Sequence, residues 1–158
     1  MGSTLALGPV EEALLARIRS TAPVTELLAD ALDGNAGVYD EVPQALPRDR
    51  RYPYVRVGDE ARSETPFDHF GGVDAKKWGS VCHVPIRVVS RFRGNAEATG
   101  IMSAIKTALD GRPLAVDGYG SVIVQCVGTT AVPGELVAGV KTRELVSDFE
   151  ITVSQRGL

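Results

Sequence analysis

Cysteine and histidine are scarce in this chain, which has two residues of each type among 158. Cys82 and Cys126 lie in apolar, strand-like runs, and neither belongs to a Cys-x-x-Cys pair. Without clustered thiols and imidazoles, neither a zinc site nor a disulfide framework is indicated. We therefore expect two buried free thiols in a protein that resides in a reducing compartment.

Long hydrophobic runs and an excess of basic residues are also missing. No apolar stretch approaches the ~20 residues that a membrane-spanning helix needs. Residues 1–8 lack the basic and apolar regions of a signal peptide. The formal net charge of −3 argues against a general nucleic-acid binder, which normally carries a strongly basic surface. We expect a soluble protein that is made in the cytoplasm.

The motifs of common enzyme classes are missing as well. No Gly-x-Ser-x-Gly elbow is present, and Gly71-Gly72 is not followed by the Gly-Lys-Ser/Thr of a phosphate loop. His69 lies in an irregular stretch beside Asp68, so a pH-sensitive or metal-binding role stays open beside that of a solvated histidine. His83 follows Cys82, but adjacent strand residues point to opposite faces and make poor ligands for one metal. The sequence predicts no catalytic residue, no cofactor and no metal site.

What the sequence does contain is clearest over residues 80–111. In the run SVCHVPIRVVSRF, Cys82, Val84, Ile86, Val88 and Phe92 fall on one face at a period of two, which predicts a half-buried strand. A helix should follow, with Asn95 as its N-cap and Gly111 just after its end. Its apolar stripe consists of Ala98, Ile101, Met102, Ile105, Ala108 and Leu109. This strand and helix form a scaffold unit without catalytic side chains.

The rest of the chain predicts one domain over residues 1–158. Residues 1–8 should form a loose arm, followed by helices over 9–20 and 23–32 and a short extended piece at 38–40. Strands are expected over 52–58, 80–92, 119–127 and 140–155. Residues 61–79 show no periodicity and predict a long loop that is either functional or mobile. The order of elements predicts an α+β fold with one mostly antiparallel four-stranded sheet and helices packed on one face.

Two groups of side chains are candidates for an interface. The irregular stretch carries the aromatic residues Phe67, Phe70 and Trp78, a residue class that is enriched at interface cores. They could equally fold back onto the domain's own core. The second group consists of charges on the outer faces of two strands, namely Arg87, Arg91, Glu144, Asp148 and Glu150. These charges serve either solubility and salt bridging within the chain, or a contact between the basic face of one subunit and the acidic face of another.

Short pieces along the chain resemble a known family, the tail completion or tail terminator proteins of long-tailed phages and gene transfer agents. The resemblance covers residues 10–155 and depends on the order and spacing of its pieces. They are Val38-Tyr39-Asp40, Val42-Pro43, Tyr52-Pro53-Tyr54-Val55, Gly58, Ser90-Arg91, Gly94, Ala96-Glu97-Ala98, Ala108-Leu109-Asp110-Gly111, Leu114 and residues 146–153. None of these pieces marks a chemical site.

The resemblance implies a structural virion protein and no enzyme. Such proteins assemble as a homohexameric ring on the last ring of tail tube subunits, at the head-proximal end of the tail. The ring stops tube growth and joins the tail to the head–tail connector or stopper protein, while DNA passes through its lumen only as cargo. Another neck or tail component, such as a head-completion protein or a tube subunit, remains an alternative. A small monomeric enzyme or ligand-binding domain is a further one.

Overall fold

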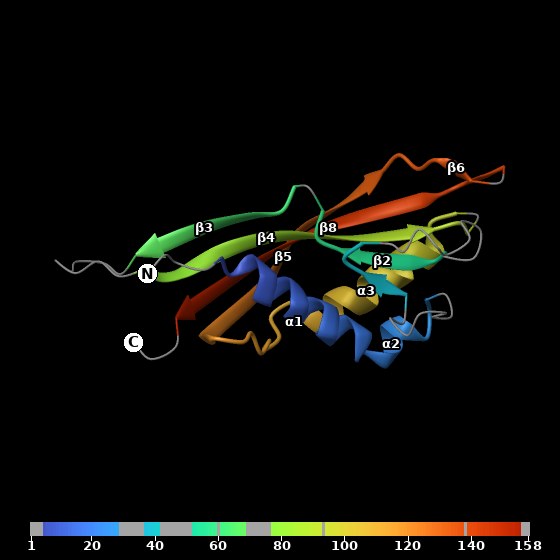
Figure 1. The fold of residues 1–158 in the computed structure, drawn as a ribbon. Coiled ribbons are helices and arrows are strands. Elements are labelled where there is room, and N and C mark those ends of the chain that lie inside the picture. Colours follow the sequence, from blue (N-terminus) through green and yellow to red (C-terminus); the bar gives the residue numbers. More distant parts are fainter. Residues whose placement is uncertain are drawn as a thin grey trace.

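The structure, a computed structural model, describes residues 5–28, 37–41, 52–59, 61–68, 77–92, 94–137 and 139–155. Figure 1 shows the order and arrangement of its elements. They are α1 (Leu7–Arg19), α2 (Ala22–Thr25), β1 (Val38–Tyr39), β2 (Tyr54–Val57), β3 (Ser63–Asp68), β4 (Lys77–Ser90), α3 (Ala96–Leu109), β5 (Tyr119–Val132), β6 (Leu136–Val137), β7 (Val140–Lys141) and β8 (Arg143–Gln155).

The main sheet is six-stranded and mixed, so the prediction of four mostly antiparallel strands is wrong in number. Its order is β1-β2-β4-β8-β5, with β3 paired to β4. β1 runs parallel to β2, and all other pairs in this sheet are antiparallel. Because β8 pairs along one edge of β4, β2 and β3 must share the other edge, β2 at residues 86–89 and β3 at residues 77–83. β6 and β7 form a separate two-stranded sheet.

The helices α1, α2 and α3 lie on one face of the sheet, as the sequence predicts (Figure 1). That face carries the alternating apolar residues of β4 and β8, which are Cys82, Val84, Ile86, Val88, Phe149, Ile151 and Val153, all fully buried. The helices contribute Val10, Leu14 and Ile18 from α1 and Ile101, Met102 and Ile105 from α3. Among the helices of the described ranges, none is long and apolar enough to cross a membrane.

The prediction of a long loop over residues 61–79 is wrong at both of its ends. Residues 63–68 form β3, and β4 begins at Lys77, so the two strands form a hairpin. The segment SETPFD gives no sign of a strand, because three consecutive polar residues are followed by a proline and no alternation of apolar and polar residues is present. Pro66 is tolerated because β3 lies at the edge of the sheet, where a missing N–H removes no ladder bond to an outer neighbour.

Two element boundaries and the capping of one helix also differ from the sequence-based expectation. α1 begins at Leu7, and Ala6 before it is fully buried, so the loose arm expected over 1–8 does not include residues 6–8. β4 ends at Ser90, which leaves Phe92 53% exposed instead of on the apolar face. Asn95 occupies the N-cap position of α3, but its side chain makes no capping hydrogen bond.

β5 pairs with β8 along most of its length, and the two strands continue toward β6 as a ribbon (Figure 1). β5 ends at Val132, five residues beyond the end of the strand expected over 119–127. β6 and β7 continue this ribbon, and reciprocal hydrogen bonds hold their base. Thr142 N donates to Glu135 O at 2.8 Å, and Glu135 N donates to Thr142 Oγ1 at 2.9 Å.

Candidate interaction surfaces

The outer face of the sheet, which is the face away from the helices, carries most of the charges that the sequence singled out. In the β4–β8 register, His83 lies opposite Glu150, Pro85 opposite Asp148 and Val89 opposite Glu144. Directly opposed residues of an antiparallel pair point to the same face, so these acids lie beside Arg87 of β4. Arg91 follows the end of β4, and its buried Nε has no hydrogen-bond partner among the described residues.

Arg87 is held by two carboxylates of its own chain. Its Nη1 donates to Glu144 Oε2 at 2.7 Å, and its Nη2 lies 3.5 Å from Asp59 Oδ2. The three side chains are 28%, 12% and 18% exposed for Arg87, Glu144 and Asp59, so water screens these contacts only in part. For Arg87, this geometry agrees with the salt-bridging interpretation of the sequence.

Asp148 and Glu150 make fewer or longer ionic contacts than Glu144 does. His83 Nε2 lies 3.9 Å from Glu150 Oε2, and both side chains are partly exposed. Asp148 is exposed and forms no ion pair within the described ranges. Beside them on β5, Ile123 is 56% exposed and Val127 is 62% exposed. This part of the outer face therefore combines acidic and apolar side chains that are open to solvent.

The predicted aromatic cluster is described only in part. Phe67 lies in β3 opposite Gly79 of β4, and its side chain is half-buried. The backbone of Trp78 belongs to β4, but its side chain lies outside the described residues, as do Phe70 and His69. The use of these aromatic residues at a contact stays a prediction.

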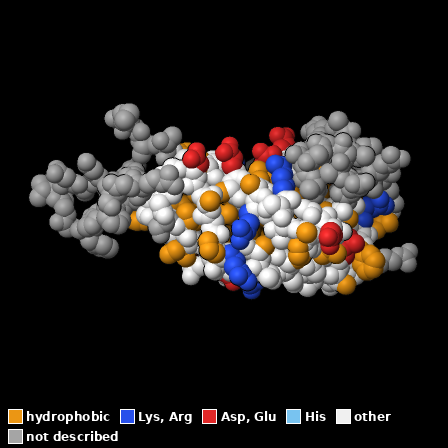
Figure 2. Space-filling view, turned by 90° about the horizontal axis from the view of Figure 1, so that it is seen from below, with side chains coloured by type: hydrophobic (Ala, Val, Ile, Leu, Met, Phe, Trp, Pro, Cys, Tyr) orange, Lys and Arg blue, Asp and Glu red, His pale blue; other side chains and the backbone are white. Residues whose placement is uncertain are grey.

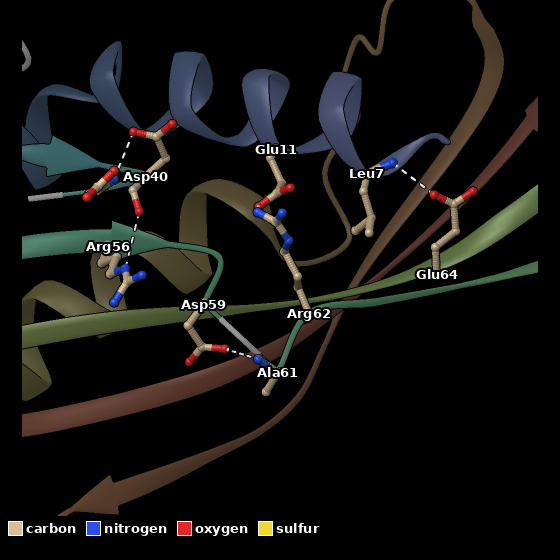
Figure 3. A network of polar contacts seen from close by, with 9 residues as sticks. Leu7, Glu11, Asp40, Arg56, Asp59, Ala61, Arg62 and Glu64 are labelled. Carbon is tan, nitrogen blue, oxygen red and sulfur yellow. Dashed lines mark hydrogen bonds and ion pairs between the residues drawn. The ribbon is translucent and has the colours of Figure 1, made fainter. Parts of the chain in front are cut away.

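A carboxylate that the sequence analysis missed attaches β3 to the start of α1. Glu64 Oε1 accepts a hydrogen bond from Leu7 N at 3.0 Å, and Ser80 Oγ donates to Glu64 Oε2 at 2.7 Å. Figure 3 shows Glu64 reaching the first residue of α1. A negative charge there satisfies an orphan N–H and interacts favourably with the helix dipole. A glutamate within an irregular-looking stretch gives no local sign of such a role.

A second link joins α1 to the segment before β3. Glu11 Oε2 lies 3.3 Å from Arg62 Nη1, and the two side chains point toward each other in Figure 3. The Glu11 side chain is only 12% exposed. Burial raises the pKa of Glu11 above its ordinary value, Arg62 partly offsets this, and Asp40 adds to the increase.

We expect the Glu11→Gln variant to change how stability depends on pH. A raised pKa means that the folded chain holds this proton more tightly than the unfolded chain, so protonation stabilises the fold. Between about pH 7.5 and about pH 5, wild type should gain up to roughly 1 kcal/mol relative to the variant. Urea unfolding at both pH values measures this gain. The matched change Glu12→Gln, at an exposed position of the same helix, should show none, and an equal gain for both variants would contradict the assignment.

Cys82 does not have the features of a nucleophile. Cys82 is fully buried, and burial, with smaller contributions from Glu64 and Glu11, raises the pKa of its thiol to about 12. Cys126 is half-buried, and both thiols are free. In the part of the chain that the structure describes, no group of three or more histidine, cysteine or acidic residues could hold a metal ion.

The helix side carries a groove with one basic end and one apolar end. A hollow of about 330 Å³ is lined by Arg17, Ser20, Thr21, Thr107, Ala108 and Arg112. A second hollow of about 320 Å³ is lined by Thr21, Pro23, Ser103, Ala104, Thr107 and Ala108. The hollows share three lining residues and are therefore continuous; together we call them the helix-side groove. Figure 2 shows Lys and Arg side chains in a band across this side, with hydrophobic side chains next to it.

Comparisons with known proteins give one family match and one match in fold. The family model described as tail completion protein gp17 matches residues 12–154. A chain in the solved structure titled "Virion of native gene transfer agent (GTA) particle" superposes with a TM-score of 0.71 at 23% sequence identity. The match covers 96% of this chain and 99% of the other, and at this identity it shows a shared fold. No curated protein sequence matches the chain.

Proposed function

This chain belongs to the tail completion protein gp17 family, a family of structural virion proteins, and from that premise we propose that it caps a phage-type tail tube. In this proposal the protein forms a homohexameric ring on the tail tube protein, ends growth of the tube and provides the joint to a head–tail connector or stopper protein. It acts at the head-proximal end of the tail, and DNA passes through the ring as cargo.

The observation that supports this proposal best is the extent of the family match, which runs over residues 12–154 of the 158 in the chain. The surfaces are compatible with a ring. A ring needs two different patches on each subunit, because every subunit contacts its two neighbours in a head-to-tail manner. The chain has an acidic and apolar patch on the outer sheet face, and a basic and apolar groove on the helix side.

The aromatic residues selected from the sequence remain part of the proposal. Phe67 is placed in the β3–β4 hairpin, which lies away from α2 and the β6–β7 ribbon (Figure 1). We propose that Phe67, Phe70 and Trp78 contact the tail tube or a neighbouring subunit. The outer charges Arg91, Asp148 and Glu150 are proposed for the contact between subunits, whereas Arg87 and Glu144 already pair within the chain.

Locating the protein in particles tests the function. We expect a tagged chain to label only the head-proximal end of the tail in electron micrographs, and loss of the protein to give unjoined heads and tails with overlong tubes. Label along the whole tube would favour a tube subunit, and label on heads without tails would favour a head-completion protein. A chain that is absent from particles and binds a small molecule as a monomer would favour an enzyme or ligand-binding domain.

A further inference from the structure

The helix-side groove holds two arginines that have no acidic partner among the described residues. Arg17 donates through Nε to Ala108 O at 3.4 Å, which fixes its guanidinium at the rim of the groove. Arg112 is exposed and lines the same hollow. Neither forms an ion pair with any acid in the described ranges. Next to them, Pro23 and Ala104 line the apolar end of the groove.

The outer sheet face has the opposite charge beside a similar apolar area. Asp148 and Glu150 of β8 are exposed or half-exposed, and the described contacts give them only the long approach of His83. On the neighbouring strand, Ile123 lies opposite Thr152 and projects from the same face, with 56% of its surface exposed. An acidic pair thus lies beside an apolar side chain, as a basic pair lies beside an apolar hollow on the helix side.

We propose that the helix-side groove of one copy receives this outer patch, formed by Ile123, Asp148 and Glu150, from a second copy of the chain. The inference rests on the proposed ring and specifies its subunit contact. Charge complementarity orients the copies: Asp148 and Glu150 meet Arg17 and Arg112, and Ile123 enters the apolar hollow. Because the two patches are different surfaces of one chain, the contact is heterologous, and a contact of this kind closes into a ring when the rotation between neighbouring copies closes.

Cross-linking of two differently marked chains tests this contact. In a Cys126→Ser background, one chain carries Ile123→Cys and the other carries Ala104→Cys, and a short bismaleimide is added to their mixture and to assembled particles. We expect a cross-linked dimer only when both chains are present. A dimer formed equally well by the Ile123→Cys chain alone would overturn the proposal, because that product requires an isologous contact. No cross-link in either sample would overturn it too.

Charge exchange gives a second, independent readout. Asp148→Lys or Arg112→Glu alone should weaken self-association by on the order of tenfold, because like charges then meet across the contact. The variant that combines Asp148→Lys with Arg112→Glu should recover most of the lost self-association. The matched controls Asp117→Lys and Lys141→Glu, both exposed and outside the two patches, should associate like wild type. Equal losses in the controls, or no recovery in the double variant, would overturn the proposal.

The two tests separate this contact from the function. If wild type labels the head-proximal end of the tail but the paired cysteines do not react, the subunit contact is wrong and the capping function stands. If the cysteines react but the label lies along the tube, the contact stands and the function is that of a tube subunit.

Discussion

Replacing Gly79 by alanine is expected to lower the free energy of unfolding by about 3 kcal/mol, which is typical of forced overpacking. A Cβ at this position would overlap the carbonyl oxygen of Val153 and approach Phe67 Cζ to 2.8 Å. The first neighbour is backbone of β8 and cannot rotate away. Relief requires β4 to move from β8, or Phe67 to leave its place in the hairpin.

Gly128 provides the matched control for this substitution. It lies in β5 of the same sheet, and a Cβ there would meet nothing within 4 Å. Gly128→Ala should therefore change stability by less than about 0.5 kcal/mol, or raise it slightly by reducing the entropy of the unfolded chain. Guanidinium unfolding of both variants measures the difference. Equal stability of the two variants would mean that the hairpin packs on β8 less closely than the structure shows.

The core strand and helix could be predicted because their signals are local. β4 places an apolar residue at every second position from Cys82 to Val88, and α3 repeats apolar residues every three or four positions, so each element shows its buried face in its own sequence. Gly111, expected just after the helix, has a φ of 67° and donates its N–H to Val124 O. Glycine adopts such a positive φ at little energetic cost, so a glycine that follows a helical pattern predicts the end of the helix.

β3 could not be predicted because its stability comes from distant partners. Its residues have neither strong β-propensity nor a clean alternation, and the strand exists by pairing with β4 and through the contacts of Glu64 with Leu7 and Ser80. Tertiary contacts override local preference in such cases. The partners of Arg87 could not be predicted for the same reason, because Glu144 is 57 positions away along the chain.

On the candidate interaction surfaces, too, local features could be predicted and contacts between distant residues could not. The sequence placed acidic and basic residues on outward-facing strand positions, which the β4–β8 register agrees with. The sequence could not show which charges are already paired within the chain. It also could not show that residues of α1 and α3 line the helix-side groove with its basic end. That distinction depends on the distances between side chains of different elements. It decides which substitutions report on assembly and which report on folding.

Arg87→Glu is expected to destabilise the isolated chain by about 2–4 kcal/mol, a stability loss that does not depend on protein concentration. The change removes a 2.7 Å charge-assisted hydrogen bond and places a third carboxylate beside Glu144 and Asp59. The reciprocal variant Arg87→Glu/Glu144→Arg should recover about 1–2 kcal/mol, and incompletely, because Asp59 still repels the new glutamate. Arg143→Glu, an exposed change on the same strand as Glu144, should stay within about 0.5 kcal/mol of wild type. Chemical unfolding of the three variants and of wild type at two protein concentrations measures these differences. If Arg87→Glu leaves the dilute chain as stable as wild type and impairs only assembly, Arg87 serves a neighbouring subunit instead of its own fold.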